Sequence, residues 1–454
     1  MKRLTVFWIL ITIYSFCPAQ ITFDKTYDFW EGMKLTDVFP VEDGYFLTGH
    51  IERTGGFYFL IKTDLYGDTI FTKKYYPEKH LKDEDPFMLT RNDAEIYLAY
   101  EINNGIYIQK FNLNGDSLWS RKVTDFGGLT EIIWTADSNF LILASNANLH
   151  LYKCDLFGNK IWESYCEMVD SNLIMSGIAS SIIEMPDGKI KASVYYSALE
   201  SHFGQTIYSF SDSGTFLQKN EIASPYDAAS IYEMMNYEED IIAIGNNMID
   251  RFYASRLSPE NDTLWVRHYL FNIFGGYFDD ITRDINNNYI MAGMIGEAHT
   301  GNFDLGLICF SADGDSLWWH NYHYEGYKSI AYDIELCPDG GLAVVGIIED
   351  LPDVKGKFLK TNELGLISGP GISEIKPRNA VKIYPNPASG VLYIEATEPV
   401  ESIDMFDNLG CKVLRVYGCK GEKVEVPLYG LAPGLYLVRV DTDEGVVARK
   451  VVVK

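Results

Sequence analysis

Short apolar runs that alternate with polar residues recur along most of the chain. Between residues 281 and 323, turn residues separate four such runs, at Ile281–Ile285, Tyr289–Ile295, Leu305–Ala312 and Ser316–His323. Alternation with a period of two predicts β-strands, because successive side chains of a strand point to opposite faces. The pattern therefore predicts one four-stranded antiparallel sheet, and close variants of this unit appear elsewhere in the sequence.

The turn before each fourth strand carries the clearest repeat. It combines an Asp or Asn, a Gly within three residues and an aromatic residue four positions after the Gly, as in Asp155-Leu-Phe-Gly158 followed by Trp162. Counting drifted copies, the turn recurs at residues 67, 115, 158, 214, 261, 314 and 365. Units of four strands at a spacing of about 40–50 residues predict a propeller, here with seven blades. We expect the aromatic rings to pack between blades, where each adds a large apolar contact.

The seventh unit predicts how the ring of blades closes. It has three strands, at Ile330–Leu336, Leu342–Ile348 and Lys357–Thr361, and then enters a stretch that contains Gly and Pro. Ahead of the first complete unit, Phe23–Tyr27 resembles fourth strands such as Trp265–Tyr269. We therefore expect the strand at 23–27 to complete the last blade, so that the propeller occupies residues 21–367 and has no long unpaired edge.

Beyond the propeller, the pattern changes. Residues 368–379 are rich in Gly, Pro, Ser and Lys, which is typical of a linker. Residues 380–454 then show seven short strand-like runs, which turns containing Gly or Pro separate. This pattern predicts a small seven-stranded Ig-like β-sandwich. The expected fold class of the whole chain is thus all-β.

The carboxyl-terminal module resembles the type A sorting domain of the type IX secretion system of Bacteroidota. Its order of motifs, its spacing and its place at the end of the chain carry the resemblance. The matching residues include Tyr384, Pro385, Asn386, Pro387, Gly390, Gly410, Pro433, Gly434, Tyr436 and Lys450. The resemblance implies that the type IX machinery is a partner and that it carries the chain across the outer membrane. It also implies removal of the module, with release of the protein or its attachment to surface lipopolysaccharide. The alternative interpretation is an ordinary adhesion-type sandwich.

The amino terminus has the pattern of a secretory signal peptide in residues 1–20. Lys2 and Arg3 precede the apolar stretch Leu4–Phe16, which is too short to span a bilayer comfortably, and we expect cleavage after Ala19 or Gln20. No other stretch is apolar enough to cross a membrane, so we expect no transmembrane segment in the mature chain. The two terminal segments together predict a protein that is secreted or held at the outer-membrane surface once both have been removed.

The charge balance excludes two classes of partner. The chain has 38 basic and 63 acidic residues, a formal net charge of −25. Loss of Lys2 and Arg3 with the signal peptide leaves 36 basic residues against 63 acidic ones, a net charge of −27. Such a surface repels phosphate groups, so we expect neither nucleic acid nor anionic lipid as a partner.

Chemistry is harder to locate, because no motif for nucleophilic catalysis, a zinc protease, a phosphate loop or a dithiol occurs, and no cofactor is predicted. One set of acids is nevertheless placed for binding. The position six residues before the turn after the first strand holds Asp37, Glu131, Asp280 and Asp333, with Ser181 and Ser230 in two other blades. Because first strands line a propeller's central channel, these acids are expected to converge at one end and bind a polar ligand or a cation such as Ca²⁺. The alternative is that each caps a turn of its own blade and that the channel holds only water.

The leading functional hypothesis is a secreted, non-enzymatic binding module for a glycan or a protein. The alternative is a hydrolase or lyase that acts on polysaccharide at the channel mouth. Such an enzyme needs paired carboxylates about 5–10 Å apart with separated pKa values, for which Asp280 and Asp333 are the best candidates. A structural role in gliding or adhesion is a third hypothesis, and the sequence does not distinguish the three.

Overall fold

The structure is a computed structural model that describes most of the chain. The described residues are 20–51, 56–75, 88–92, 95–102, 104–146, 148–168, 175–198, 203–222, 229–247, 251–269, 273–297, 303–350, 353–367, 381–396, 400–406, 412–419, 423–442 and 445–454. The predicted signal peptide, apart from Gln20, and the predicted linker 368–379 lie outside them. The chain forms two compact units, residues 1–370 and 371–454. Among the described residues, no helix has the length and apolar character needed to cross a membrane.

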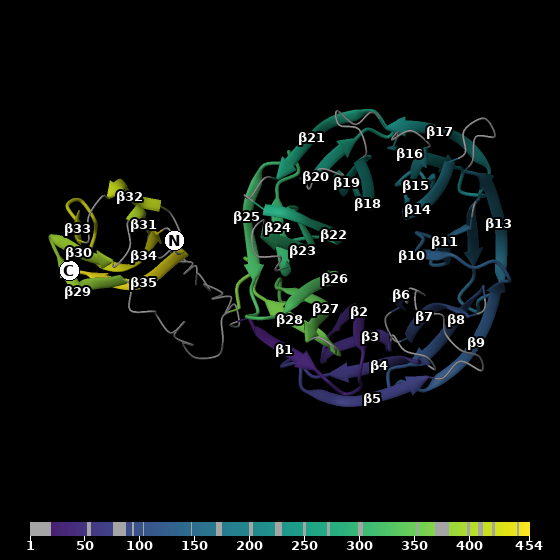
Figure 1. Cartoon of the computed structure of the whole chain (residues 1–454), viewed down its shortest axis with the longest axis horizontal. Helices are drawn as coiled ribbons and strands as arrows, with labels where there is room; N and C mark the ends of the chain where they lie inside the picture. Colours follow the sequence, from purple (N-terminus) through teal and green to yellow (C-terminus); the bar gives the residue numbers. More distant parts are fainter. Residues whose placement is uncertain are drawn as a thin grey trace, which may run out of the picture. The chain divides into compact units, whose positions relative to one another are not determined.

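The first unit is built from seven four-stranded antiparallel sheets in its described residues, which Figure 1 shows arranged in a ring. The first three sheets contain β2 (Met33–Val41), β3 (Gly44–Ile51), β4 (Tyr58–Thr63) and β5 (Thr69–Tyr75); β6 (Met88–Asn92), β7 (Glu95–Ile102), β8 (Gly105–Asn112) and β9 (Ser117–Thr124); and β10 (Leu129–Trp134), β11 (Phe140–Asn146), β12 (Asn148–Cys154) and β13 (Lys160–Glu167).

The next three sheets contain β14 (Met175–Glu184), β15 (Ile190–Ala198), β16 (Phe203–Phe210) and β17 (Phe216–Ile222); β18 (Ala229–Tyr237), β19 (Asp240–Asn247), β20 (Arg251–Leu257) and β21 (Thr263–Tyr269); and β22 (Ile273–Arg283), β23 (Tyr289–Glu297), β24 (Phe303–Phe310) and β25 (Ser316–Tyr322). The last sheet contains β26 (Lys328–Leu336), β27 (Leu342–Asp350), β28 (Asp353–Thr361) and β1 (Phe23–Tyr27). The unit is a seven-bladed β-propeller, as the repeats predict.

The burial pattern follows from the position of each strand in its sheet. The second and third strands are almost fully buried, whereas fourth strands such as β5 and β13 alternate exposed and partly buried residues. The hydrophobic cores lie between sheets: Phe46 and Tyr58 of the first sheet pack with Leu98 and Phe111 of the second in one cluster. Adjacent blades therefore stabilise each other by burying apolar surface that a single sheet would expose.

The repeated turn glycines and aromatic rings meet between blades, which confirms their predicted packing. A Cβ atom added to Gly214 would lie 2.7 Å from the ring of Trp162 in the preceding sheet. Gly67 has the same relation to Phe23, and Gly314 to Trp265. A glycine is needed here because its φ is positive and because the ring leaves no room for a side chain.

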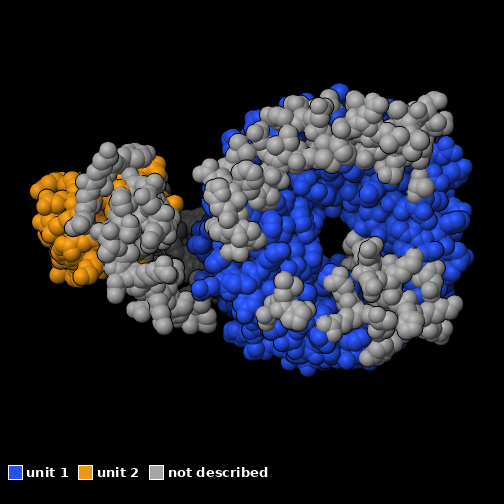
Figure 2. Space-filling view, in the orientation of Figure 1, with its two compact units in different colours: residues 1–370 blue, residues 371–454 orange. Residues whose placement is uncertain are grey.

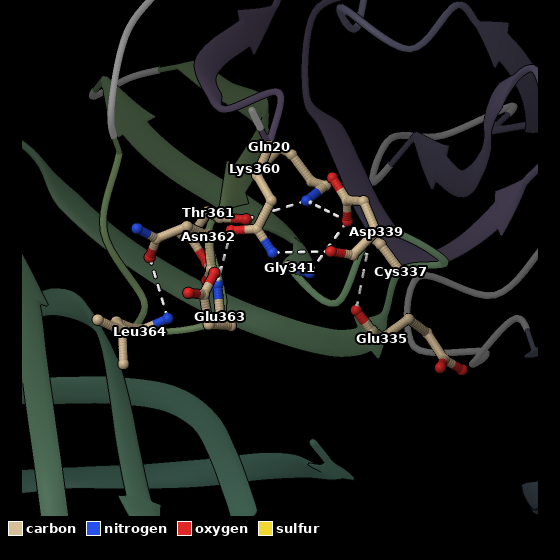
Figure 3. A network of polar contacts seen from close by, with 10 residues as sticks. All are labelled: Gln20, Glu335, Cys337, Asp339, Gly341, Lys360, Thr361, Asn362, Glu363 and Leu364. Atoms are coloured by element: carbon tan, nitrogen blue, oxygen red, sulfur yellow. Dashed lines mark hydrogen bonds and ion pairs between the residues drawn. The ribbon is translucent and has the colours of Figure 1, made fainter. Parts of the chain in front are cut away.

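The amino-terminal strand closes the ring. Strand β1 pairs antiparallel with β28, with Phe23 opposite Lys360 and Tyr27 opposite Gly356, as the sequence comparison predicts. Polar contacts extend this seam (Figure 3). Gln20 Nε2 donates to the backbone oxygen of Asp339 (2.8 Å), and the buried Lys360 Nζ donates to Asp339 Oδ1 (3.0 Å). Both ends of the propeller chain are thus held to the same sheet.

The second unit contains seven described strands: β29 (Val381–Ser389), β30 (Val391–Ala396), β31 (Val400–Phe406), β32 (Lys412–Cys419), β33 (Lys423–Pro427), β34 (Gly434–Thr442) and β35 (Gly445–Val453). Their order is β32-β31-β34-β35-β29-β30-β33, and a single parallel bridge between Ala388 and Val453 joins two antiparallel groups. Leu392 from one group and Ile403 and Val438 from the other share one buried core. The unit is a small β-sandwich, as predicted.

Candidate functional site in the propeller channel

A β-bulge in the first strand of six blades turns side chains toward the channel. In β2 the register shifts between Leu35 and Asp37, and equivalent shifts occur in β10, β14, β18, β22 and β26. A bulge adds one residue and re-aims the side chains next to it. The residues just after the bulges, here called the ring positions, are Asp37, Glu131, Ser181, Glu233, Asp280 and Asp333.

The four predicted acids lie in the wall of one cavity of about 680 Å³, here called the mouth cavity. These are Asp37, Glu131, Asp280 and Asp333. The same wall includes Glu233, Asp279 and Glu335, which the sequence reasoning missed. Figure 2 shows the opening of the channel in the surface of the propeller.

The prediction for the fifth blade is wrong by three residues. It places Ser230 at the ring position, but Glu233 occupies it, and Ser230 pairs with Asn246 nearer the start of β18. The prediction counts six residues back from Asn236 as the turn residue. The hairpin in fact turns at residues 238–239, where Glu238 adopts a positive φ. Without an Asp-Gly pair, this turn carried no marker that would have set the register.

The ring positions also link each blade to the next. Backbone N–H groups of the following first strand donate to three of the acids: Ile182 to Glu131 Oε2 (2.6 Å), Ile334 to Asp280 Oδ2 (2.9 Å) and Val38 to Asp333 Oδ2 (2.6 Å). Ser181 accepts the equivalent bond from Met234 (3.1 Å). These residues therefore satisfy donors of the neighbouring blade, rather than capping a turn of their own.

Burial raises the pKa values of the carboxyls in the mouth cavity, because a low-dielectric wall disfavours the charged form. The pKa of Glu131 rises from 4.5 to about 8, although hydrogen bonds from Ile182 and Ser181 oppose the rise. The pKa values of Asp279 and Glu335 also rise to about 8, with the charge of Asp280 adding to the effect of burial. Several carboxyls of the mouth cavity are therefore largely protonated near neutral pH.

Asp280 and Asp333 form a coupled pair. Their mutual interaction opposes the burial that raises the pKa of Asp280 and adds to the burial that raises the pKa of Asp333. Two neighbouring buried carboxyl groups cannot both ionise without strong repulsion, so they titrate as a pair.

The described residues in the wall of the mouth cavity do not form a calcium site. Calcium needs about six to eight oxygen ligands around one point. Within the described ranges, no three His, Cys, Asp or Glu side chains are grouped closely enough to hold a metal ion. The acids come from several blades around the channel, and three of them, Glu131, Asp280 and Asp333, already accept from backbone donors.

A second cavity of about 480 Å³, here called the inner cavity, adjoins the mouth cavity. Glu131, Met235 and Thr282 line both. Two buried polar atoms on its lining residues, Trp134 Nε1 and Asn236 Oδ1, have no hydrogen-bond partner within the described part of the chain. Asn236 Nδ2 donates to the backbone oxygen of Glu184 (2.7 Å). Both residues line the inner cavity, and Trp134 lies three residues after Glu131, a predicted site residue.

The motif residues of the second unit tie its first strand to its last. Asn386 donates through Nδ2 to the backbone oxygen of Lys450 (2.9 Å) and accepts through Oδ1 from the Val452 N–H (2.9 Å). Tyr436 donates its hydroxyl to the backbone oxygen of Ala432 (2.8 Å). The remaining described motif residues are Tyr384, Pro385, Pro387, Gly390, Pro433 and Gly434, whereas Gly410 lies outside the described residues.

Residues 382–454 match the protein family described as the secretion system C-terminal sorting domain. The chain is a sorted β-propeller of the type IX secretion system. Its sorting domain implies that the secretion machinery is a partner and that the protein is secreted and attached at the cell surface. No curated protein matches the sequence.

Several solved structures resemble this sorted propeller. The β-propeller domain of the Trilobed protease from Pyrococcus furiosus is 13% identical, with a TM-score of 0.46, and the match covers 74% of this chain and 99% of that one. The Dos1 propeller is 11% identical, with a TM-score of 0.42 and coverage of 77% and 98%. A protein of unknown function from Bacteroides caccae is 12% identical, with a TM-score of 0.38 and coverage of 64% and 94%. Likeness at this level carries no inference about ligands.

Proposed function

We propose that this chain is a non-enzymatic, extracellular glycan-binding protein whose ligand enters the propeller channel. Export begins with a signal peptide in residues 1–20, and the sorting domain is removed after passage through the outer membrane, as in the secretion system of Bacteroidota. The glycan is then bound in the inner cavity, with the acidic wall of the mouth cavity beside it.

One observation carries the choice of a glycan. The inner cavity places an unpaired donor, Trp134 Nε1, and an unpaired acceptor, Asn236 Oδ1, on lining residues. A buried polar atom without a partner costs about 1–3 kcal/mol, which a suitable ligand recovers on binding. A sugar hydroxyl both accepts and donates, so a run of hydroxyls satisfies both atoms. The aromatic ring of Trp134 also supplies the apolar surface that small-molecule sites combine with a few polar groups.

A glycan array with the isolated propeller, residues 20–367, tests this proposal. We expect one class of glycan to bind, and the Asn236→Ala variant to lose at least tenfold in affinity. An exposed turn variant, Asp212→Asn, is the matched control and should retain the wild-type affinity. The proposal fails if no glycan binds, or if Asn236→Ala binds as tightly as the control.

The hydrolase or lyase alternative receives no support from its proposed pair. Both carboxyls already accept a hydrogen bond from a backbone N–H of the following blade, Ile334 to Asp280 (2.9 Å) and Val38 to Asp333 (2.6 Å), which gives the pair a structural role. Product analysis on the glycans that bind the array tests this reading. Turnover by the wild type that disappears in Asp333→Asn would reverse it.

A further inference from the structure

The mouth cavity combines acids with aromatic rings. Its wall contains the seven carboxyls described above together with Tyr232, Tyr277 and Tyr332. Among its described lining residues there is no Lys or Arg. A wall of this composition contains no competing cation and places carboxyl oxygens among aromatic residues, an arrangement that accommodates a positive charge.

Asp279 is the acid of this wall that lacks a complete set of partners. It is the bulge residue of β22, and its Oδ2 is buried without a hydrogen-bond partner in the part of the chain that the structure describes. Tyr232 and Tyr277 line the same cavity as Asp279, and burial, followed by the charge of Asp279, raises the pKa of both phenols. An unpaired buried carboxyl oxygen beside two aromatic rings indicates a missing donor.

The chemistry of that donor is an ammonium group rather than a bare metal ion. A metal ion requires several oxygen ligands at one point, which the described side chains do not provide. An ammonium group needs only one or two acceptors, and aromatic side chains complete its surroundings. A carboxylate that pairs with an ammonium also recovers much of the free energy lost on burial of its charge.

The two cavities are contiguous, since Glu131, Met235 and Thr282 line both. We propose that the ligand is an aminated glycan, with hydroxyl groups at Trp134 and Asn236 in the inner cavity and a free amino group beside Asp279, Tyr232 and Tyr277 in the mouth cavity. This inference rests on the proposed glycan binding and adds the identity of the charged group.

Calorimetry with two matched oligosaccharides tests the inference. Hexamers of chitosan and of chitin share a backbone and differ in whether each amine is free or acetylated, so only chitosan carries positive charge. At about pH 6, where an amine is protonated, we expect the propeller to bind chitosan at least tenfold more tightly than chitin. Asp279→Asn should remove this preference, whereas Asn236→Ala should weaken both ligands and Asp212→Asn neither.

The outcomes separate this inference from the proposed function. Equal binding of the two hexamers overturns the ammonium site and leaves glycan binding intact. A preference for chitosan that survives in Asp279→Asn overturns its location. If neither hexamer nor any arrayed glycan binds, the proposed glycan-binding function is wrong. Binding of a lysine-containing peptide would then point to a protein ligand. Thermal unfolding of each variant checks that the fold is retained.

Discussion

Single residues in the repeated turn show how packing selects sequence. Six of the seven turns carry a glycine that a ring of the preceding sheet covers. The fifth has Asn261, with φ of 73°, and the preceding sheet has Gln218 in place of the aromatic residue. Asn tolerates positive φ better than most residues, and its Nδ2 donates to Asn220 Oδ1 (3.1 Å) on that same preceding strand. Because no aromatic ring covers this turn, the side chain of Asn261 has the room that the other turns lack.

Two alanine substitutions separate backbone strain from packing at these turns. Gly214→Ala introduces a Cβ 2.7 Å from Trp162, whereas Gly188→Ala, at a similar φ, has no closer neighbour than 3.6 Å. We expect Gly188→Ala to cost about 1–2 kcal/mol through its backbone conformation. Gly214→Ala should cost about 1–3 kcal/mol more, because the ring must move. Denaturant midpoints measure the difference, and equal midpoints would contradict the packing argument.

The raised pKa values of the channel acids predict that stability depends on pH. Glu131, Asp279 and Glu335 have pKa values of about 8 in the folded protein, from ordinary values of 4.5, 3.8 and 4.5. Between these limits the folded state binds more protons than the unfolded chain, so stability falls as pH rises through this window. We expect a lower thermal midpoint at about pH 8 than at about pH 5. Glu335→Gln should reduce that fall and Asp212→Asn should not, and a midpoint that rises with pH would refute the effect.

Among the single elements, the closing strand β1 stands out because it contacts two blades at once. Phe23 packs edge-on against Phe358 of the last sheet, with ring centroids 4.9 Å apart, and against Tyr45 of the first, at 6.0 Å. The strand β1 therefore supplies hydrogen bonds to one blade and an apolar contact to the next. Without it, β28 would be an unpaired edge, which invites association with other chains.

The variant Phe23→Ala tests this closure. Removal of a packed aromatic ring costs about 3–5 kcal/mol in a well-packed core, and somewhat less here because Phe23 is partly exposed. We expect a lower unfolding midpoint, together with faster hydrogen exchange at the β28 amides. Phe157→Ala, which removes a ring that is 64% exposed, is the control and should change neither. Unchanged exchange in β28 would show that β1 does not protect that strand.

The strands and turns also show how much of the fold the sequence predicts. Strands, turn glycines and the partner of Phe23–Tyr27 were readable because alternation and turn residues are local signals. The ring positions depended on counting from a turn, so the count failed at Glu238 and Glu239, where the turn lacks glycine. The bonds from Ile182, Ile334 and Val38 to the preceding blade were not readable, because they depend on how neighbouring sheets approach.

The whole molecule consists of two units with separate cores. The second unit has a hydrophobic core of its own and carries its own motif contacts, such as those of Asn386. The sorting function therefore belongs to the second unit, independently of what the propeller binds.

A fusion tests this separation. Residues 368–454, joined to a reporter with a signal peptide, should direct it to the surface of a host that has a type IX secretion system. The same fusion with Asn386→Ala loses both hydrogen bonds to the last strand, and we expect weaker export. A fusion that stays in the periplasm would show that the propeller contributes to sorting. Cell fractionation and surface proteolysis provide the measurement.

The pairing of β1 with β28 also determines when the propeller can finish folding. On the proposed export route, the strand at Phe23–Tyr27 crosses the inner membrane early, and its partner at Asp353–Thr361 follows more than three hundred residues later. The first strand must therefore wait, without its final partner, until nearly all of the propeller has been delivered. We expect a periplasmic holding factor to be needed during that delay, and the circle to shut only when translocation is almost complete.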